Sequence, residues 1–145
     1  MTIFEELRVD HDKQRKLLEL LLETTGEAPE REQYYQQLKL QLEQHAAAEE
    51  RYFYNPLIKD DDTIEMSRHG IAEHHEIDEL IETLEQTEMS SPAWLQHFKN
   101  LKHKVLHHLK DEEQGFFQRA GKGLSESEKS GLGSDYRNMM KEKGL

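Results

Sequence analysis

A chain of 145 residues with 34% apolar and 34% charged residues is long enough for one hydrophobic core and suits amphipathic helices. Its formal charge of −11, with no stripe of lysines and arginines, argues against binding to nucleic acid. The lack of cysteine excludes disulfides, thiolate metal sites and cysteine nucleophiles. The sequence contains no uninterrupted apolar run of the kind that forms a secretion signal or a membrane span. We therefore expect a cytoplasmic protein with neither nucleic acid nor membrane as a partner.

The first half of the chain is predicted to form two long helices. Apolar residues recur at helical spacing from about residue 2 to 24, and Gly26 then interrupts the pattern. A second helix begins near residue 30 and stops near Asn55, because the proline that follows disfavours helix at the preceding residue.

Two further helices are predicted in the second half. The acidic stretch at 60–63 can cap a third helix that runs to about Glu88. Ser91 and Pro92 are typical of an N-cap and a first-turn proline, and they open a fourth helix that ends near Arg119.

The helical patterns and the lack of any strand pattern predict an all-α fold, and the short connections favour an antiparallel bundle. We expect residues 1–120 to form an antiparallel, up-and-down four-helix bundle. Residues 121–145 are richer in glycine and serine and are expected to be an appended tail with one short helix, which a capping box at Ser125 and Glu128 would open.

The chain contains an internal repeat that sorts its nine histidines. When the sequence is shifted by 63 residues, His11 aligns with His74 and His45 aligns with His108. The other five histidines align with residues of other types. The bundle is therefore expected to consist of two similar helical hairpins, and the four matched histidines form one candidate set.

The repeat also marks two glutamates as members of this set. The second helix of each hairpin carries His-x-x-x-Glu-Glu, at 45–50 and at 108–113. Residues four apart share a helix face, so His45 pairs with Glu49 and His108 pairs with Glu112.

Neighbouring residues of the motif receive other roles. Glu50 and Glu113 point about 100° away and are expected to be solvated or to support the ligands from outside. Phe53 and Phe116 are expected one turn further along the ligand face, where they would exclude water.

In an antiparallel bundle these residues meet at the centre. Because buried carboxylates are costly unless they are paired or bind metal, this combination predicts a metal site. The predicted metal ligands are His11, His45, Glu49, His74, His108 and Glu112.

At these positions the sequence resembles the hemerythrin-like, HHE cation-binding family. The resemblance is carried by VDHD around His11, HAAAEERYFYNPL from His45, AEHHE around His74 and HLKDEEQGFF from His108. It implies a non-haem di-iron centre with an oxo or hydroxo bridge, in which Glu49 and Glu112 bridge the metals and the histidines are terminal ligands. Oxygen, nitric oxide or hydrogen peroxide would be the small-molecule partner, and sensing, storage or detoxification the role, in a monomer or weak homodimer.

One departure from the family pattern concerns a fifth histidine. Oxygen-carrying hemerythrins have one a turn away from the third-helix ligand, whereas Gly70 and Asp78 stand four residues before and after His74 here. Reversible oxygen carriage is therefore not predicted. His69, with a helix irregularity at Gly70, or Asp78 remains a candidate further ligand.

Three alternatives stay open at this point. Ferritin-like di-iron proteins use Glu-x-x-His with more carboxylates, and a structural zinc site usually takes four closed ligands. A histidine phosphotransfer bundle is suggested by the HHLKD segment at 107–111, although Asp111 stands where that motif expects glycine. Whether the protein is an enzyme is not determined by these patterns.

Overall fold

The computed structural model describes all residues from 1 to 145, and the prediction of an all-α fold is confirmed. The long helices are α1 (Ile3–Leu22), α2 (Pro29–Glu49), α4 (Ile64–Glu85), α5 (Pro92–Asp111) and α7 (Glu126–Glu142). Shorter segments are the π-helices η1 (Glu50–Tyr54) and η2 (Glu112–Phe116), and the α-helices α3 (Asn55–Leu57) and α6 (Phe117–Gly123). None of the helices is long and apolar enough to cross a membrane.

The capping residues explain where several helices begin. The Ser91 hydroxyl accepts from the backbone N–H of Ala93, and Ser125 and Glu128 form the expected capping box. Thr63 stands at the start of α4 but does not cap it with its side chain, because its hydroxyl instead donates to the carbonyl of Leu57. This bond ties α3 to the start of α4.

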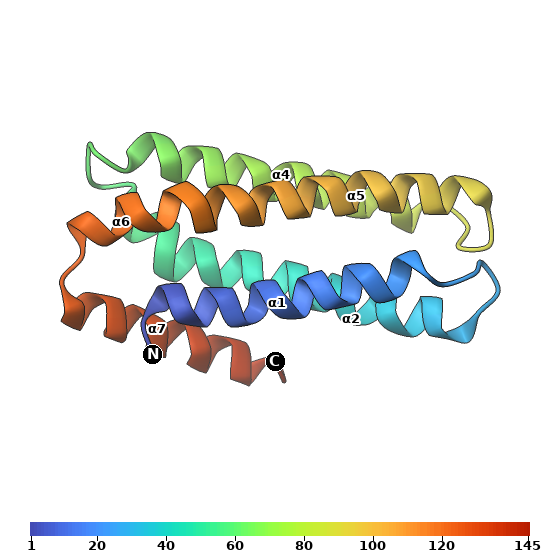
Figure 1. Ribbon diagram of the computed structural model, residues 1–145, viewed down its shortest axis with the longest axis horizontal. Helices are drawn as coiled ribbons and strands as arrows, with labels where there is room; N and C mark the ends of the chain where they lie inside the picture. Colours follow the sequence, from blue (N-terminus) through green and yellow to red (C-terminus); the bar gives the residue numbers. More distant parts are fainter.

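The long helices lie side by side in an elongated bundle. In Figure 1 the pair α4 and α5 lies along the pair α1 and α2, and the chain reverses direction through short connections. The tail helix α7 packs against α1 and α2, on the side away from α4 and α5. The tail was expected to contain one short helix, but α7 has 17 residues, and it docks on the first hairpin.

Two apolar clusters occupy the ends of the bundle. One cluster of 13 buried residues includes Leu18, Leu38 and Trp94. The other, with 11 buried residues, includes Ile3 and Phe53. Each fully buried side chain of this size contributes about 1.5–3 kcal/mol to folding. The polar residues singled out in the sequence lie between these clusters.

Both helices that carry the His-x-x-x-Glu motif change to π-helical geometry at the motif. A π turn holds an extra residue, so it rotates the side chains that follow onto different faces. Tyr54 and Phe117 therefore follow the glutamates on the polar face, instead of the Phe53 and Phe116 expected from a regular α-helix. Phe53 lies in the apolar cluster, and Phe116 is only partly buried.

Candidate metal centre

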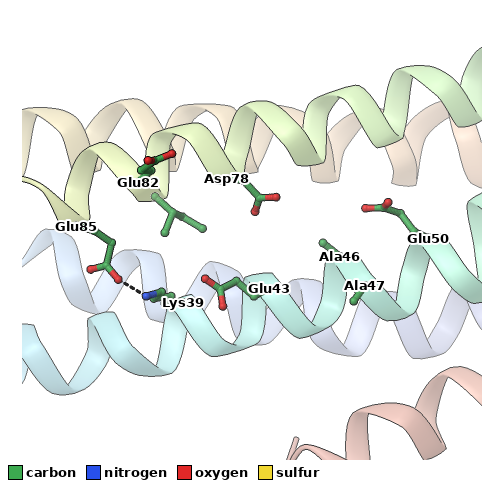
Figure 2. A pocket seen from close by; sticks show the side chains of 9 residues that line it. Lys39, Glu43, Ala46, Ala47, Glu50, Asp78, Glu82 and Glu85 are labelled. Carbon is green, nitrogen blue, oxygen red and sulfur yellow. Dashed lines mark hydrogen bonds and ion pairs between the residues drawn. The ribbon is translucent and has the colours of Figure 1, made fainter.

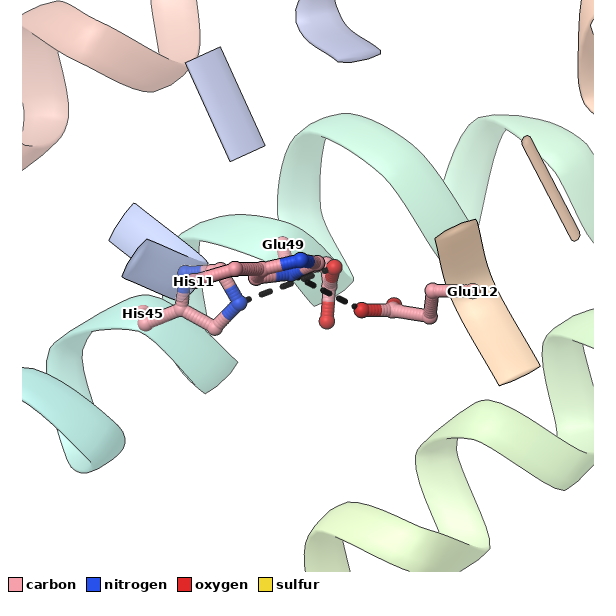
Figure 3. Close-up of side chains that lie close together, drawn as sticks. All are labelled: His11, His45, Glu49 and Glu112. Atoms are coloured by element: carbon pink, nitrogen blue, oxygen red, sulfur yellow. Dashed lines mark ion pairs between the residues drawn. The ribbon is translucent and has the colours of Figure 1, made fainter. Parts of the chain in front are cut away.

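The six predicted ligands meet in the interior of the bundle. Each has at most 4% of its surface exposed. They form two adjoining groups in which the potential ligand atoms lie within 4.8 Å of one another, and Glu49 belongs to both. The first group comprises His11, His45, Glu49 and Glu112 (Figure 3), and the second comprises Glu49, His74 and His108.

The two oxygens of Glu49 face different groups. Oε2 lies 3.7 Å from Nε2 of His45, whereas Oε1 lies 2.8 Å from Nε2 of His74 and 3.7 Å from Nε2 of His108. One oxygen of this carboxylate therefore faces each group.

The two oxygens of Glu112 also face different groups. Its Oε1 lies 3.1 Å from Nε2 of His11, and its Oε2 lies 3.6 Å from Nε2 of His108. Two carboxylates thus lie between the two groups, and each group contains two histidines.

The inward-facing atoms of these side chains have no hydrogen-bond partner. They are the Nε2 atoms of the four histidines, both oxygens of Glu49 and Oε1 of Glu112, all buried. Buried polar atoms are nearly always paired, because an unpaired one costs about 1–3 kcal/mol. Seven such atoms facing one small region fit the donor set of bound cations, so the residues present fit a metal centre.

The outward-facing Nδ1 atom of each histidine is hydrogen-bonded. The partners are Glu113 for His11 at 2.6 Å, Tyr136 for His45 at 2.6 Å, Glu50 for His74 at 2.9 Å and Glu73 for His108 at 2.9 Å. Such a bond places the proton on Nδ1, fixes the ring plane and leaves the Nε2 lone pair free for a metal. Glu50 and Glu113 therefore hold the rings of two predicted ligands, His74 and His11.

The repeat also relates these outer partners. Glu113 and Glu50 are repeat mates, and each binds the histidine of the other hairpin. Glu73 precedes His74 in the chain, and its repeat mate is Asp10, which precedes His11. Sequence reasoning missed both acids, although their equivalent positions were a usable signal.

Asp10 reaches its histidine through the tail helix. Its side chain is one methylene shorter than that of Glu73, and Tyr136 of α7 bridges the gap. The Tyr136 hydroxyl donates to Asp10 and accepts from Nδ1 of His45. Asp10 also lies 3.2 Å from Arg137 and 3.3 Å from Lys13. Nothing in the sequence pattern indicated that the tail would contact the centre.

The electrostatics of the histidines differ from one another. Burial lowers the pKa of His11 and His74, but the two glutamates beside each ring outweigh burial and raise the pKa of each to about 9. Burial, together with repulsion from His11, lowers the pKa of His45 to about 3. A cation in this region would therefore compete with protons for His11 and His74, and less so for His45.

Comparison with known proteins agrees with this geometry. The profile of the hemerythrin HHE cation-binding domain matches residues 2–120. The chain belongs to the hemerythrin HHE cation-binding family. A crystal structure of a hemerythrin HHE cation-binding domain-containing protein from Mycobacterium kansasii superposes with a TM-score of 0.85, covering 99% of this chain and 88% of the other at 20% identity. A search of curated proteins gives no significant match.

The hemerythrin-like fold of this chain differs from the oxygen-carrier pattern at Gly70. A Cβ atom built there would lie 2.2 Å from Cζ of Tyr54, so glycine is needed to admit this ring. The Tyr54 hydroxyl in turn donates to Oε2 of Glu112. Tyr54 therefore fills the space in which a side chain at position 70 would lie. In the sequence, the glycine four residues before His74 and the aromatic run after Glu49 could have indicated this contact.

Neither further candidate ligand joins the buried groups. His69 is 57% exposed and faces outward toward Glu73 and Asp111. Asp78 is exposed, and no group of potential ligand atoms includes it. The two buried groups thus consist of the six predicted residues.

An acidic groove runs along the outside of α2 and α4 (Figure 2). It has a volume of about 510 Å³ and is lined by Glu43, Glu50, Asp78, Glu82 and Glu85, with Lys39 paired to Glu85. Asp78 also borders a cavity of about 10 Å³ that touches His45, His74 and His108. The groove therefore brings negative charge to the outer edge of the centre, where it would attract cations.

Proposed function

We propose that this protein holds a non-haem di-iron centre that handles a small ligand such as oxygen, nitric oxide or hydrogen peroxide. The proposal rests on seven buried donor atoms that have no hydrogen-bond partner and that lie in two groups between which the carboxylates are shared. Membership in a cation-binding family supports the same conclusion.

The geometry suggests a role for each residue. His11 and His45 would hold one ion, and His74 and His108 the other. Glu49 and Glu112 would each offer one oxygen to each ion, since their two oxygens face different histidines.

The donor chemistry favours iron. All donors are nitrogen or carboxylate oxygen, and a structural zinc ion would be satisfied by four of them, which leaves two without a role. Iron in such a site supplies redox change between ferrous and ferric states and open positions for a small ligand. A phosphotransfer function would leave the buried donors unexplained.

The surroundings restrict what can reach the centre. The cavity beside His45, His74 and His108 has room for about one water-sized molecule. Val105 and Ile77 line it with apolar surface. A space this small agrees better with a very small ligand than with a larger substrate.

Metal analysis of protein expressed with supplemented iron tests this proposal. We expect about two irons per chain and a visible absorption band after aerobic oxidation. His45→Ala and Glu112→Ala should each lower the iron content sharply, because each removes an inward donor. His97→Ala is the matched control, since His97 lies outside the buried groups. One zinc per chain, no metal, or equal loss in all three variants would refute the di-iron assignment.

A further inference from the structure

A second cluster of metal-ligand side chains lies on the outer face of α4 and α5. Nε2 of His69 lies 3.6 Å from Oε1 of Glu73 and 4.0 Å from Oδ2 of Asp111. The same Asp111 oxygen lies 3.2 Å from Nε2 of His107. Each helix contributes one histidine and the acid four residues later, so both pairs project from one face.

We propose that His69, Glu73, His107 and Asp111 form a separate site for one divalent transition-metal ion, at the surface of the second hairpin. Imidazole and carboxylate together suit zinc and the borderline ions cobalt and nickel. The ligand atoms of His69, Glu73 and Asp111 lie within 4.8 Å of one another.

The spacing of these atoms is close to that of a bound ion. Ligand atoms about 2.0–2.1 Å from a tetrahedral ion lie roughly 3.3 Å apart. The contact of 3.2 Å matches this spacing, whereas those of 3.6 and 4.0 Å need His69 to move by several tenths of an ångström. His107 contacts Asp111 but lies outside the close group of His69, Glu73 and Asp111, so its ring must move further to join them. His69 and His107 are 57% and 54% exposed, so their rings are free to make such shifts.

The internal repeat supplies an independent argument for a cation at this place. In the first hairpin, the repeat mates of His69 and Glu73 are Glu6 and Asp10. The guanidinium of Arg137, carried by α7, pairs with both of these acids. The equivalent position in the first hairpin is thus occupied by a positive charge from the tail.

The second hairpin has no helix over this face. The tail helix α7 packs on α1, α2 and η1, so no arginine from α7 pairs with Glu73 and Asp111. Lys104 of α5 approaches the other oxygen of Glu73, Oε2, at 3.6 Å. Oε1 of Glu73 faces His69, and because the Glu73 side chain is buried, an ion would reach this oxygen only from the side of the exposed His69 ring.

Glu73 connects this surface site to the buried centre. Its Oε1 also accepts the hydrogen bond from Nδ1 of His108. An ion on Glu73 would withdraw negative charge from His108 and weaken it as a donor. This coupling rests on the proposed di-iron function, whereas the surface site itself does not.

The test is a Co²⁺ titration of the full-length protein after its iron content has been measured. We expect one cobalt ion per chain to bind, with visible d–d absorption, while the iron content stays constant. His69→Ala and Asp111→Asn should each weaken cobalt binding by about tenfold or more, because each removes a ligand.

The matched control is His75→Ala. His75 pairs with Glu79 on the same helix at 3.9 Å, in the same His-x-x-x-Glu spacing, but no ligand from α5 faces it. Cobalt affinity should change less than twofold in this variant. Equal weakening in His75→Ala, no cobalt binding, or cobalt that only replaces iron would overturn the surface site.

The two proposals fail in different ways. Loss of the surface site leaves the iron content and the visible band of the buried centre intact. Failure of the di-iron proposal appears as missing iron, while cobalt binding that depends on His69 would remain.

Discussion

Replacing Tyr136 with phenylalanine removes one oxygen atom from the outer support of the candidate centre. The hydroxyl is fully buried and joins Asp10 to Nδ1 of His45. Phenylalanine fills nearly the same volume, so the apolar packing of α7 should persist. Asp10 keeps its contacts with Arg137 and Lys13, but the N–H of His45 loses its acceptor.

The size of the effect follows from this unpaired group. A buried N–H without an acceptor costs about 1–3 kcal/mol, and loss of an outer partner of a ligand histidine typically lowers metal affinity about 10–100-fold. The ring of His45 would also be free to turn, so its Nε2 would no longer be held toward Glu49.

Metal affinity, measured by competition with a chelator at fixed pH, is the direct assay. Tyr52→Phe is the control, because Tyr52 is only partly buried and its hydroxyl makes no hydrogen bond. We expect Tyr136→Phe to bind metal about 10–100-fold more weakly and the control to match the parent protein. An unchanged affinity in Tyr136→Phe would show that the tail helix does not position His45.

Two further predictions concern pH and the packing at Gly70. The pKa of His11 and His74 is raised from 6.5 to about 9, so their contribution to the stability of the metal-free protein is complete below pH 6.5 and is lost as pH rises through 9. Denaturant unfolding of this form should show a fall on the order of a few kcal/mol between these pH values, and metal-loaded protein, whose ligands are already deprotonated, should not. A flat profile for the metal-free form would contradict the assigned charges. Gly70→Ala should destabilise the protein by about 1–3 kcal/mol in thermal unfolding, since its Cβ would lie 2.2 Å from Tyr54, and the same change in a Tyr54→Ala background should cost much less. Equal costs in both backgrounds would rule out this clash.

Much of the helical architecture was accessible from sequence because it depends on local periodicity. The four long helices, the capping box of the tail and the cap at Ser91 all follow from residues within a few positions of one another. The repeat then selected the six buried residues, since a duplicated hairpin places equivalent side chains at equivalent depths. Their role as iron ligands remains a proposal.

Other features of the centre depend on contacts between distant parts of the chain. The π turns after Glu49 and Glu112 bring Tyr54 toward the polar face, where Gly70 of another helix admits its ring. Helical periodicity predicted a different pair of aromatic residues, because it assumes that the α-helix continues unchanged.

The tail shows most clearly the difference between what the sequence predicts and what only the tertiary structure shows. Its sequence predicted a helix opened by the capping box at Ser125, although a shorter one than α7, because helix formation and capping are local. Its docking on the first hairpin, and the hydrogen bonds of Tyr136 to Asp10 and His45, join residues 126 and 91 positions apart. Such contacts follow from which faces pack together, and only the tertiary structure decides that.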